Sequence, residues 1–158
     1  MRKTLVDPIT LNQTAPGHEA WLDVGRISRV ALTSEDPGFP IESVFRPEAS
    51  SGWRAGGKGE QAIRLTFEPP QRIQRIWLRF IETEAKRTQE ISLRWRSEPH
   101  GGMREIVRQQ WNFSPRGSTM EVEDFKVDLE GVSVLELTII PDLSSREFVA
   151  SLAEWYIA

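Results

Sequence analysis

Residues 61–82 read QAIRLTFEPPQRIQRIWLRFIE and contain two stretches in which apolar and polar residues alternate. The stretches cover residues 61–68 and 72–82 and are separated by Pro69 and Pro70. Side chains two residues apart on a β-strand point to the same face, so each stretch predicts a strand that buries one face. Proline has no backbone N–H to donate to a neighbouring strand, so the proline pair predicts a turn between the two strands.

The same alternation recurs on both sides of this segment, between clusters of Gly, Pro, Ser and Asp. It predicts further strands over residues 21–32, 89–96, 103–111, 120–129, 132–140 and 150–157. No sustained helical periodicity is present, and we expect only one short helical turn, at residues 40–45. About eight short strands joined by turns predict an all-β fold, an antiparallel β-sandwich or jelly roll.

The overall composition is typical of a single folded domain. The chain has 158 residues, of which 39% are hydrophobic and 27% charged. Residues 1–19 are polar and predict an extended N-terminal arm, and residues 20–158 predict the sandwich. A net charge of −3 argues against non-specific attraction to nucleic acid. The N-terminus lacks the apolar region of a signal peptide and no apolar run has the length of a membrane span, so we expect a cytoplasmic protein without a membrane partner.

The residues that most often carry catalysis are scarce. There is no cysteine and there are two histidines, His18 in the polar arm and His100 in a turn. Neither histidine has the spacing of a metal site or a neighbouring nucleophile motif. We therefore expect no catalytic residues and a protein that is not an enzyme.

Several short motifs follow one another along the chain. A Ser- and Pro-containing loop at residues 33–37 precedes a tryptophan segment at residues 51–55. Two strands follow, with the patterns Q-x-I-x-L-x-F at residues 61–67 and I-x-x-I-x-L at residues 73–78, and the chain closes with a Ser-Leu-x-Glu strand at residues 150–157. This order is similar to that of discoidin domains, the coagulation-factor C-type, galactose-binding-like domains that include many carbohydrate-binding modules. The resemblance implies a binding module that recognises carbohydrate through loops at one end of the sandwich.

The resemblance also implies a structural Ca²⁺ site and no other cofactor. Members of this family often bind one cation between the loop before the tryptophan and the glutamate of the final strand. By position, this implies Glu154 together with carbonyls near residues 45–51, with Glu48 in place of the aspartate that is usual there. Ca²⁺ favours such sets of carbonyl and carboxylate oxygens. The alternative is that Glu154 is an outward residue on the last strand.

A carbohydrate site needs aromatic faces for the apolar side of a sugar ring and amide or guanidinium donors for its hydroxyl groups. Residues of both kinds fall in loops or at strand ends. The candidate ligand-binding residues are Trp53, Arg54, Arg87, Gln89, Arg108, Trp111 and Asn112. The alternative for a tryptophan such as Trp53 is packing beneath its loop, which is usual in this family.

Two other kinds of partner remain open. Trp and Arg are frequent at protein–protein hot spots, and an acidic stretch at residues 119–125 beside a basic strand at residues 104–108 would suit a protein-interaction module. Residues 53–61 are also similar to a domain of a eukaryotic DNA single-strand-break repair scaffold, which works through protein and nucleic-acid contacts. Nucleic acid ranks third, because the net charge opposes it. Carbohydrate or another polar small molecule ranks first.

Overall fold

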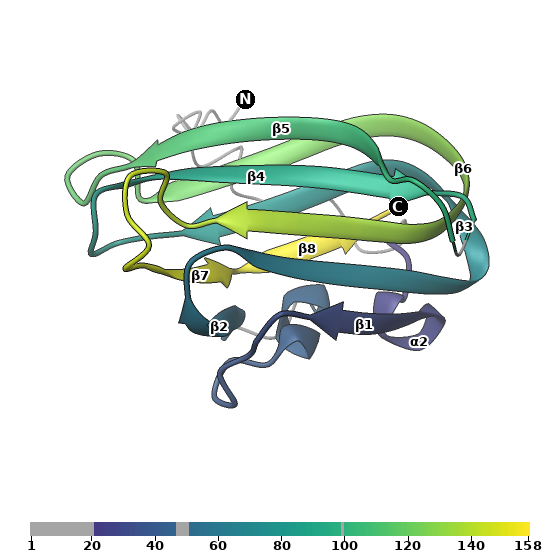
Figure 1. Cartoon of the computed structure of the whole chain (residues 1–158), viewed down its shortest axis with the longest axis horizontal. Helices are drawn as coiled ribbons and strands as arrows, with labels where there is room; N and C mark the ends of the chain where they lie inside the picture. Colours follow the sequence, from purple (N-terminus) through teal and green to yellow (C-terminus); the bar gives the residue numbers. More distant parts are fainter. Residues whose placement is uncertain (1–20, 47–50, 99) are drawn as a thin grey trace, which may run out of the picture.

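The computed structural model describes residues 21–46, 51–98 and 100–158, and these fold almost entirely into antiparallel strands (Figure 1). The strands are β1 (Ser28–Leu32), β2 (Trp53–Lys58), β3 (Gln61–Ile81), β4 (Arg87–Arg96), β5 (Arg104–Phe113), β6 (Met120–Ile140), β7 (Val149–Leu152) and β8 (Glu154–Ile157). The helices are a single turn, α2 (Val24–Ile27), and a 3₁₀ helix, η2 (Ile41–Phe45). The all-β sandwich expected from the sequence is confirmed. No helix in the described ranges is long and apolar enough to cross a membrane.

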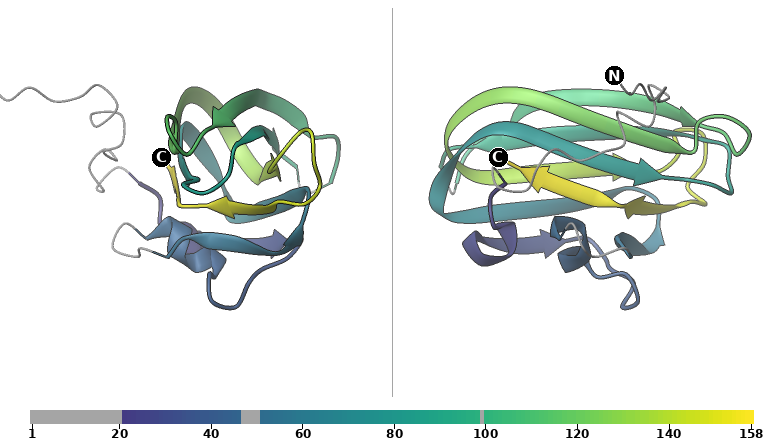
Figure 2. Two further views of the ribbon diagram at one scale, coloured as in Figure 1. Left: turned by 90° about the vertical axis from the view of Figure 1, so that its left-hand side faces the viewer. Right: turned by 180° about the vertical axis from the view of Figure 1, so that it is seen from behind.

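Two long strands, β3 and β6, run side by side and take part in both layers of the sandwich. They pair from Gln61–Ile139 to Ile81–Met120, and their register shifts midway, between Thr66 and Arg75. The first half of β3 and the second half of β6 form one layer with β1, β4 and β5, in the order β1-β3-β6-β4-β5. Their other halves form a second layer with β8. Seen from one end, the strands curl around one interior (Figure 2).

The alternating pattern predicts the buried face correctly. Ile63, Leu65 and Phe67 on β3 are buried, whereas Arg64 and Glu68 lie on the outer side. The interior is filled mainly by the apolar residues of β3, β4, β6 and β8 together with Trp53 and Trp155. Burial of this apolar surface, at about 25 cal/mol per Å², is the main force that holds the two layers together.

Several boundaries differ from those expected. Residues 61–68 and 72–82 form one strand, as do residues 120–129 and 132–140, because the chain bends without leaving the sheet. The expected strand at residues 21–32 begins as the turn α2, and residues 150–157 divide into β7 and β8. The segment WRAGGK forms a strand, β2, that was not expected because it lacks apolar alternation. The helical turn expected at residues 40–45 is confirmed as η2.

The loops collect at one end of the sandwich, on the left in Figure 1. This end carries the turns that join β2 to β3, β3 to β4 and β5 to β6, and the longer connection from β6 to β7. The chain between β1 and β2 also approaches this end, where the amide of Asp36 donates to the carbonyl of Arg54. The sandwich therefore presents a loop-built rim, as expected. The N-terminal arm lies outside the described residues.

Candidate functional site

A buried arginine at the start of β4 holds the rim together. The Nε of Arg87 donates to the Oε1 of Glu82 at 2.7 Å. Its Nη1 donates to the side-chain oxygen of Gln89 at 2.9 Å and to the carbonyl of Pro141 at 2.7 Å. The guanidinium also lies 4.8 Å from the ring centre of Phe113. One side chain thus joins the β3–β4 turn, the β6–β7 connection and the end of β5.

The carboxylates of the rim are held in the ionised form. Burial alone would raise the pKa of Glu82, but hydrogen bonds from Arg87 and from the amide of Glu84 outweigh it, so this pKa lies below the usual value. Burial also acts on Asp142, and hydrogen bonds from the Thr88 amide and Ser144 lower its pKa overall. The β6–β7 connection is therefore fastened to β4 by charge as well as by backbone bonds.

A concavity of about 630 Å³ opens beside this rim, between β2, the β3–β4 turn and β7. We call it the loop-end pocket. It is lined by Phe39, Ser51, Gly52, Trp53, Arg54, Ile81, Glu82, Thr83, Glu84, Ala85, Phe148, Val149, Ser151, Leu152 and Ala153. Its volume lies within the range of pockets that hold small molecules.

One wall of the loop-end pocket is an arginine stacked on an aromatic ring. The guanidinium carbon of Arg54 lies 4.7 Å from the centre of the Phe39 ring. The two residues are also joined through the backbone, because the Arg54 amide donates to the Phe39 carbonyl at 3.3 Å. Arg54 is exposed and Phe39 half-buried. This pair, the Phe39–Arg54 platform, offers a ligand an aromatic surface and a cationic donor that are fixed relative to each other.

Another part of the lining of the loop-end pocket is apolar. Ile81 and Val149 expose 41% and 37% of their surface and are among the few large apolar side chains of the described chain that do so. Both line the loop-end pocket, as does the half-buried Phe148. Glu84 is exposed at the same place and adds a hydrogen-bond acceptor. The loop-end pocket thus combines apolar surface with charged and hydroxyl groups.

Solved structures with a similar architecture include carbohydrate-binding modules, and no family model and no curated protein matches the chain. A family 32 module of a family 31 glycoside hydrolase from Clostridium perfringens has a TM-score of 0.62 at 13% identity and covers 87% of this chain and 93% of its own. The chain has the galactose-binding-like, discoidin-type jelly-roll fold.

Two further modules with the galactose-binding-like fold are described with bound sugars. The family 32 module of the protein AlyQ, in complex with 4,5-unsaturated mannuronic acid, has a TM-score of 0.59 at 18% identity, covering 84% of this chain and 95% of its own. That of NanJ from C. perfringens, in complex with galactose, has a TM-score of 0.57 at 14% identity, covering 82% and 92%. In contrast, the chain spans only 24% of a similar Ruminococcus gnavus fucosidase. At these identities the likeness establishes the fold.

The galactose-binding-like fold brings only part of the expected ligand site together. Trp53 and Arg54 both line the loop-end pocket. Trp53, however, is 1% exposed and packs in the core, and its indole nitrogen has no hydrogen-bond partner among the described residues. Arg87 and Gln89 are also buried, behind the loop-end pocket. The structure buries these three side chains beside the rim, and their contact with a ligand stays a prediction.

The remaining expected residues lie on β5, away from the loop-end pocket. Arg108 is bound to Glu90 and Glu105, and Asn112 accepts a hydrogen bond from Thr88 at 2.7 Å. Trp111 is half-buried and packs against the core. They therefore do not share a concavity with Trp53. They lie apart because β5 is the outermost strand of its layer.

The acidic stretch at residues 119–125 and the basic strand at residues 104–108 lie on strands that do not pair with each other. The basic strand β5 pairs with β4, whereas residues 120–129 pair with β3. Within the acidic stretch, Glu121 is buried and Asp124 binds Arg75 at 2.6 Å. The stretch is therefore divided between the core and an ion pair across the sheet.

The carboxylate that the resemblance assigns to a structural cation, Glu154, has two partners within the chain itself. The carboxylate of Glu154 is bound by the guanidinium of Arg79 and accepts a hydrogen bond from the hydroxyl of Tyr156. A guanidinium in contact with the carboxylate neutralises the charge that a divalent cation would need. The second expected ligand, Glu48, lies outside the described residues. Within residues 21–46, 51–98 and 100–158, no three acidic or histidine side chains are grouped to hold a metal.

Sequence reasoning missed most residues that line the loop-end pocket. Phe39 carries a usable signal, because an aromatic residue between Gly38 and Pro40 sits in a turn where packing does not require it. Ile81 and Val149 carry none. Each lies in an ordinary strand, and its exposure follows only from how β3 and β7 end at the rim.

Proposed function

We propose that this chain is a non-catalytic binding module that recognises saccharides through the loop-end pocket. The observation that carries the proposal is the Phe39–Arg54 platform, which stands in the wall of the pocket at the rim of a galactose-binding-like fold. Modules of the same fold that hold galactose or a uronic acid support the choice of ligand class. The lining of the loop-end pocket supplies apolar, charged and hydroxyl groups that can bind a ligand.

The chemistry of the loop-end pocket suits a sugar ring. One face of a pyranose is made of C–H groups and packs on aromatic or aliphatic surface, which Phe39, Ile81 and Val149 provide. The edge of the ring carries hydroxyl groups that both donate and accept. Arg54 supplies donors for them and Glu84 supplies an acceptor.

The β3–β4 turn that lines the loop-end pocket is held in place before any ligand arrives. Glu82 is fixed by Arg87 at 2.7 Å, and Glu84 follows it in a turn closed by a bond from the Glu84 amide to the Glu82 carboxylate at 3.2 Å. Groups that are already ordered lose less conformational entropy on binding. This preorganisation favours recognition of small ligands that bury little surface.

The test is a titration with galactose and fucose, monitored by amide chemical shifts and by calorimetry. We expect the shifts to concentrate on residues 39, 51–54, 81–85 and 148–153. Arg54→Gln removes the charged donor and Phe39→Ala removes the ring. Arg54→Gln is expected to weaken binding about tenfold or more, since a hydrogen bond to a charged group contributes about 1.5–3 kcal/mol. Phe39→Ala is expected to weaken binding about three- to tenfold, since contact with an aromatic ring contributes about 0.5–1.5 kcal/mol.

The matched control is Arg146→Gln, an exposed arginine in the β6–β7 connection that does not line the loop-end pocket. It should leave affinity unchanged. Equal losses in Arg54→Gln and Arg146→Gln, or an absence of shifts around the loop-end pocket with both sugars, would contradict the proposal.

A further inference from the structure

We propose that the outer face of the five-stranded layer carries a second saccharide site, separate from the loop-end pocket. A concavity of about 300 Å³ lies on this face, over β3, β6, β4 and β5. We call it the sheet-face trough. None of its lining residues lines the loop-end pocket, so the two sites stand independently of each other.

The floor of the sheet-face trough is a row of three short side chains that ends at an arginine. Ala62 is paired with Thr138, Thr138 with Ser92, and Ser92 with Arg108, so the four residues follow one another across four strands. Neighbouring strands lie about 4.8 Å apart, which gives the row a length of about 14 Å. The short side chains leave room above the sheet, and Ser92 and Thr138 direct hydroxyl groups to the same face as Arg108.

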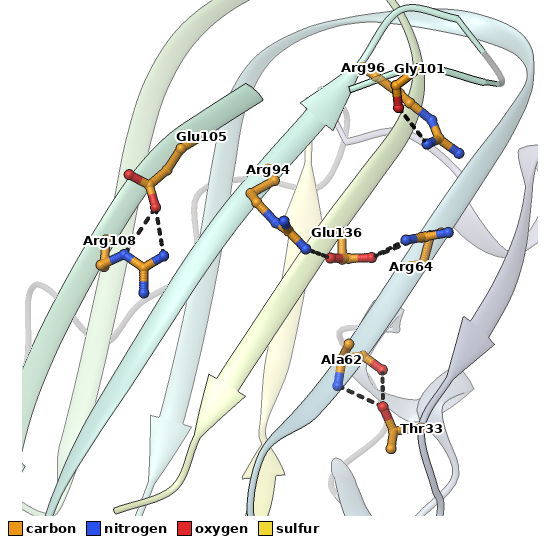
Figure 3. A network of polar contacts seen from close by, with 9 residues as sticks. All are labelled: Thr33, Ala62, Arg64, Arg94, Arg96, Gly101, Glu105, Arg108 and Glu136. Atoms are coloured by element: carbon orange, nitrogen blue, oxygen red, sulfur yellow. Dashed lines mark hydrogen bonds and ion pairs between the residues drawn. The ribbon is translucent and has the colours of Figure 1, made fainter. Parts of the chain in front are cut away.

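One wall of the sheet-face trough is formed by Glu136 and Arg94, and Arg64, which does not line the trough, completes an ion-paired row with them (Figure 3). The Nε of Arg64 donates to the Oε2 of Glu136 at 2.8 Å, and Arg94 donates to the Oε1. Burial alone would raise the pKa of Glu136, but the bonds from the two arginines lower it below its usual range. The row is thus fixed in its charged form, and each guanidinium keeps further N–H groups for a ligand.

The other wall is ordered in the same way. Glu90 accepts a hydrogen bond from Arg108 at 3.1 Å and another from Gln110 at 3.2 Å. Arg108 is held again from its other side by Glu105, at 2.9 Å. Carboxylate oxygens have about two acceptor positions each, so Glu90 retains capacity for a hydroxyl donor.

The balance of charge indicates the class of ligand. Two arginines, 94 and 108, and three glutamates, 60, 90 and 136, line the sheet-face trough, and Arg64, which is not part of the lining, pairs with Glu136. An anionic or cationic ligand would meet groups of both signs, whereas a neutral polyhydroxyl ligand can donate to the glutamates and accept from the arginines at once. The volume fits one or two sugar residues. No aromatic ring lines the cavity, so we expect hydrogen bonds to provide most of the affinity.

The probes are galactose and, as its anionic counterpart, galacturonic acid, each titrated into the whole chain and monitored by amide chemical shifts. Galactose is expected to shift residues 62, 92 and 138. Thr138→Val and Ser92→Ala remove one hydroxyl each and keep the strands, and each should weaken binding at these residues about three- to tenfold. Thr66→Val is the matched control, because Thr66 is a half-buried threonine on the outer face of β3, two pairs from Arg64 and outside the cavity.

The outcomes separate this proposal from the previous one. Shifts at residues 62, 92 and 138 that fall in Thr138→Val but not in Thr66→Val support the sheet-face trough, whatever happens at the loop-end pocket. Shifts confined to the loop-end pocket would overturn the trough and leave the proposed function standing. An equal loss of galactose affinity in Thr66→Val and Thr138→Val would also overturn the sheet-face trough. So would tighter binding of galacturonic acid than of galactose at residues 62, 92 and 138.

Discussion

At the scale of single residues, the structure depends most on a few charged groups that are buried together. Arg87 is 4% exposed and satisfies three acceptors that belong to three different segments. A buried charge is tolerated only when it is paired and hydrogen-bonded. The rim of the loop-end pocket therefore relies on one guanidinium, although that group does not reach the ligand surface.

Replacing this guanidinium should be costly. We expect Arg87→Met to lower the free energy of unfolding by about 3–5 kcal/mol, because Glu82, Gln89 and the Pro141 carbonyl lose their common donor. Urea denaturation measures the change. The control is Arg72→Met, which breaks an exposed pair with Asp128 and should cost about 1 kcal/mol or less. Similar losses in the two variants would show that Arg87 has no special role.

At the scale of elements, the short pair of β2 and β7 shapes the loop-end pocket. Gly52, just before β2, has a φ of +67°, a conformation that residues with a Cβ avoid. A Cβ at Gly52 would also lie 2.7 Å from the carbonyl oxygen of Leu152 on β7. The close approach of the two strands thus requires glycine.

Two glycine substitutions separate these two effects. Gly59→Ala places a Cβ at a φ of +86° with nothing within 4 Å, so it should cost about 1–2 kcal/mol from backbone strain alone. Gly52→Ala adds the clash with Leu152 and should cost more, and it should weaken saccharide binding as β7 moves. Chemical denaturation and calorimetry measure both effects. Equal destabilisation would mean that the strands separate without cost.

The sequence correctly predicts the strands that have one solvent-exposed face and one buried face. In β3 and β4 the alternation is regular, and the buried set is the expected one, including Ile91 and Leu93. It fails for β2, where packing against β7 makes a strand of Trp53–Lys58 despite two glycines. It also fails at Gly131, where a turn signal occurs inside β6 and the chain continues. Both failures have one cause, because tertiary pairing overrides local preference.

The candidate site is less predictable than the fold. The sequence places the loops at one end and includes Arg54, which lines the loop-end pocket. It cannot tell that Trp53 turns inward, since an aromatic residue at the start of a strand is equally compatible with either face. Nor can it show that Ala62, Ser92 and Thr138 lie in one row, because this depends on the register of three strands.

At the scale of the whole molecule, one buried acid makes stability depend on pH. Glu121 lies opposite Phe80 on the inner side of β6. Burial, followed by the hydrogen bond and charge of Glu123, raises the pKa of Glu121 to about 9, against the opposing effect of Arg87. An unfolded glutamate titrates near pH 4.3. Between these values the folded chain keeps a proton that the unfolded chain has lost, so this group lowers stability as pH rises.

Glu121→Gln should remove this dependence. Relative to the wild type, we expect the variant to gain stability steadily from about pH 5 to pH 9, by up to about 1.4 kcal/mol per pH unit. Denaturation at a series of pH values measures the difference. Glu130→Gln, at an exposed position on the same strand, is the control. Its free energy of unfolding should change with pH in the same way as that of the wild type. If the free energy of unfolding of Glu121→Gln also changes with pH as the wild type does, Glu121 is not protonated in the folded protein.

The sharing of β3 and β6 between both layers has a consequence for how the domain can be divided. A cut in the β4–β5 connection would leave β3 on one fragment and β6 on the other. Neither fragment could then assemble even one complete layer, because each layer needs a segment of both strands. We therefore expect that neither fragment folds stably until the two associate, and that the domain unfolds as a single cooperative unit.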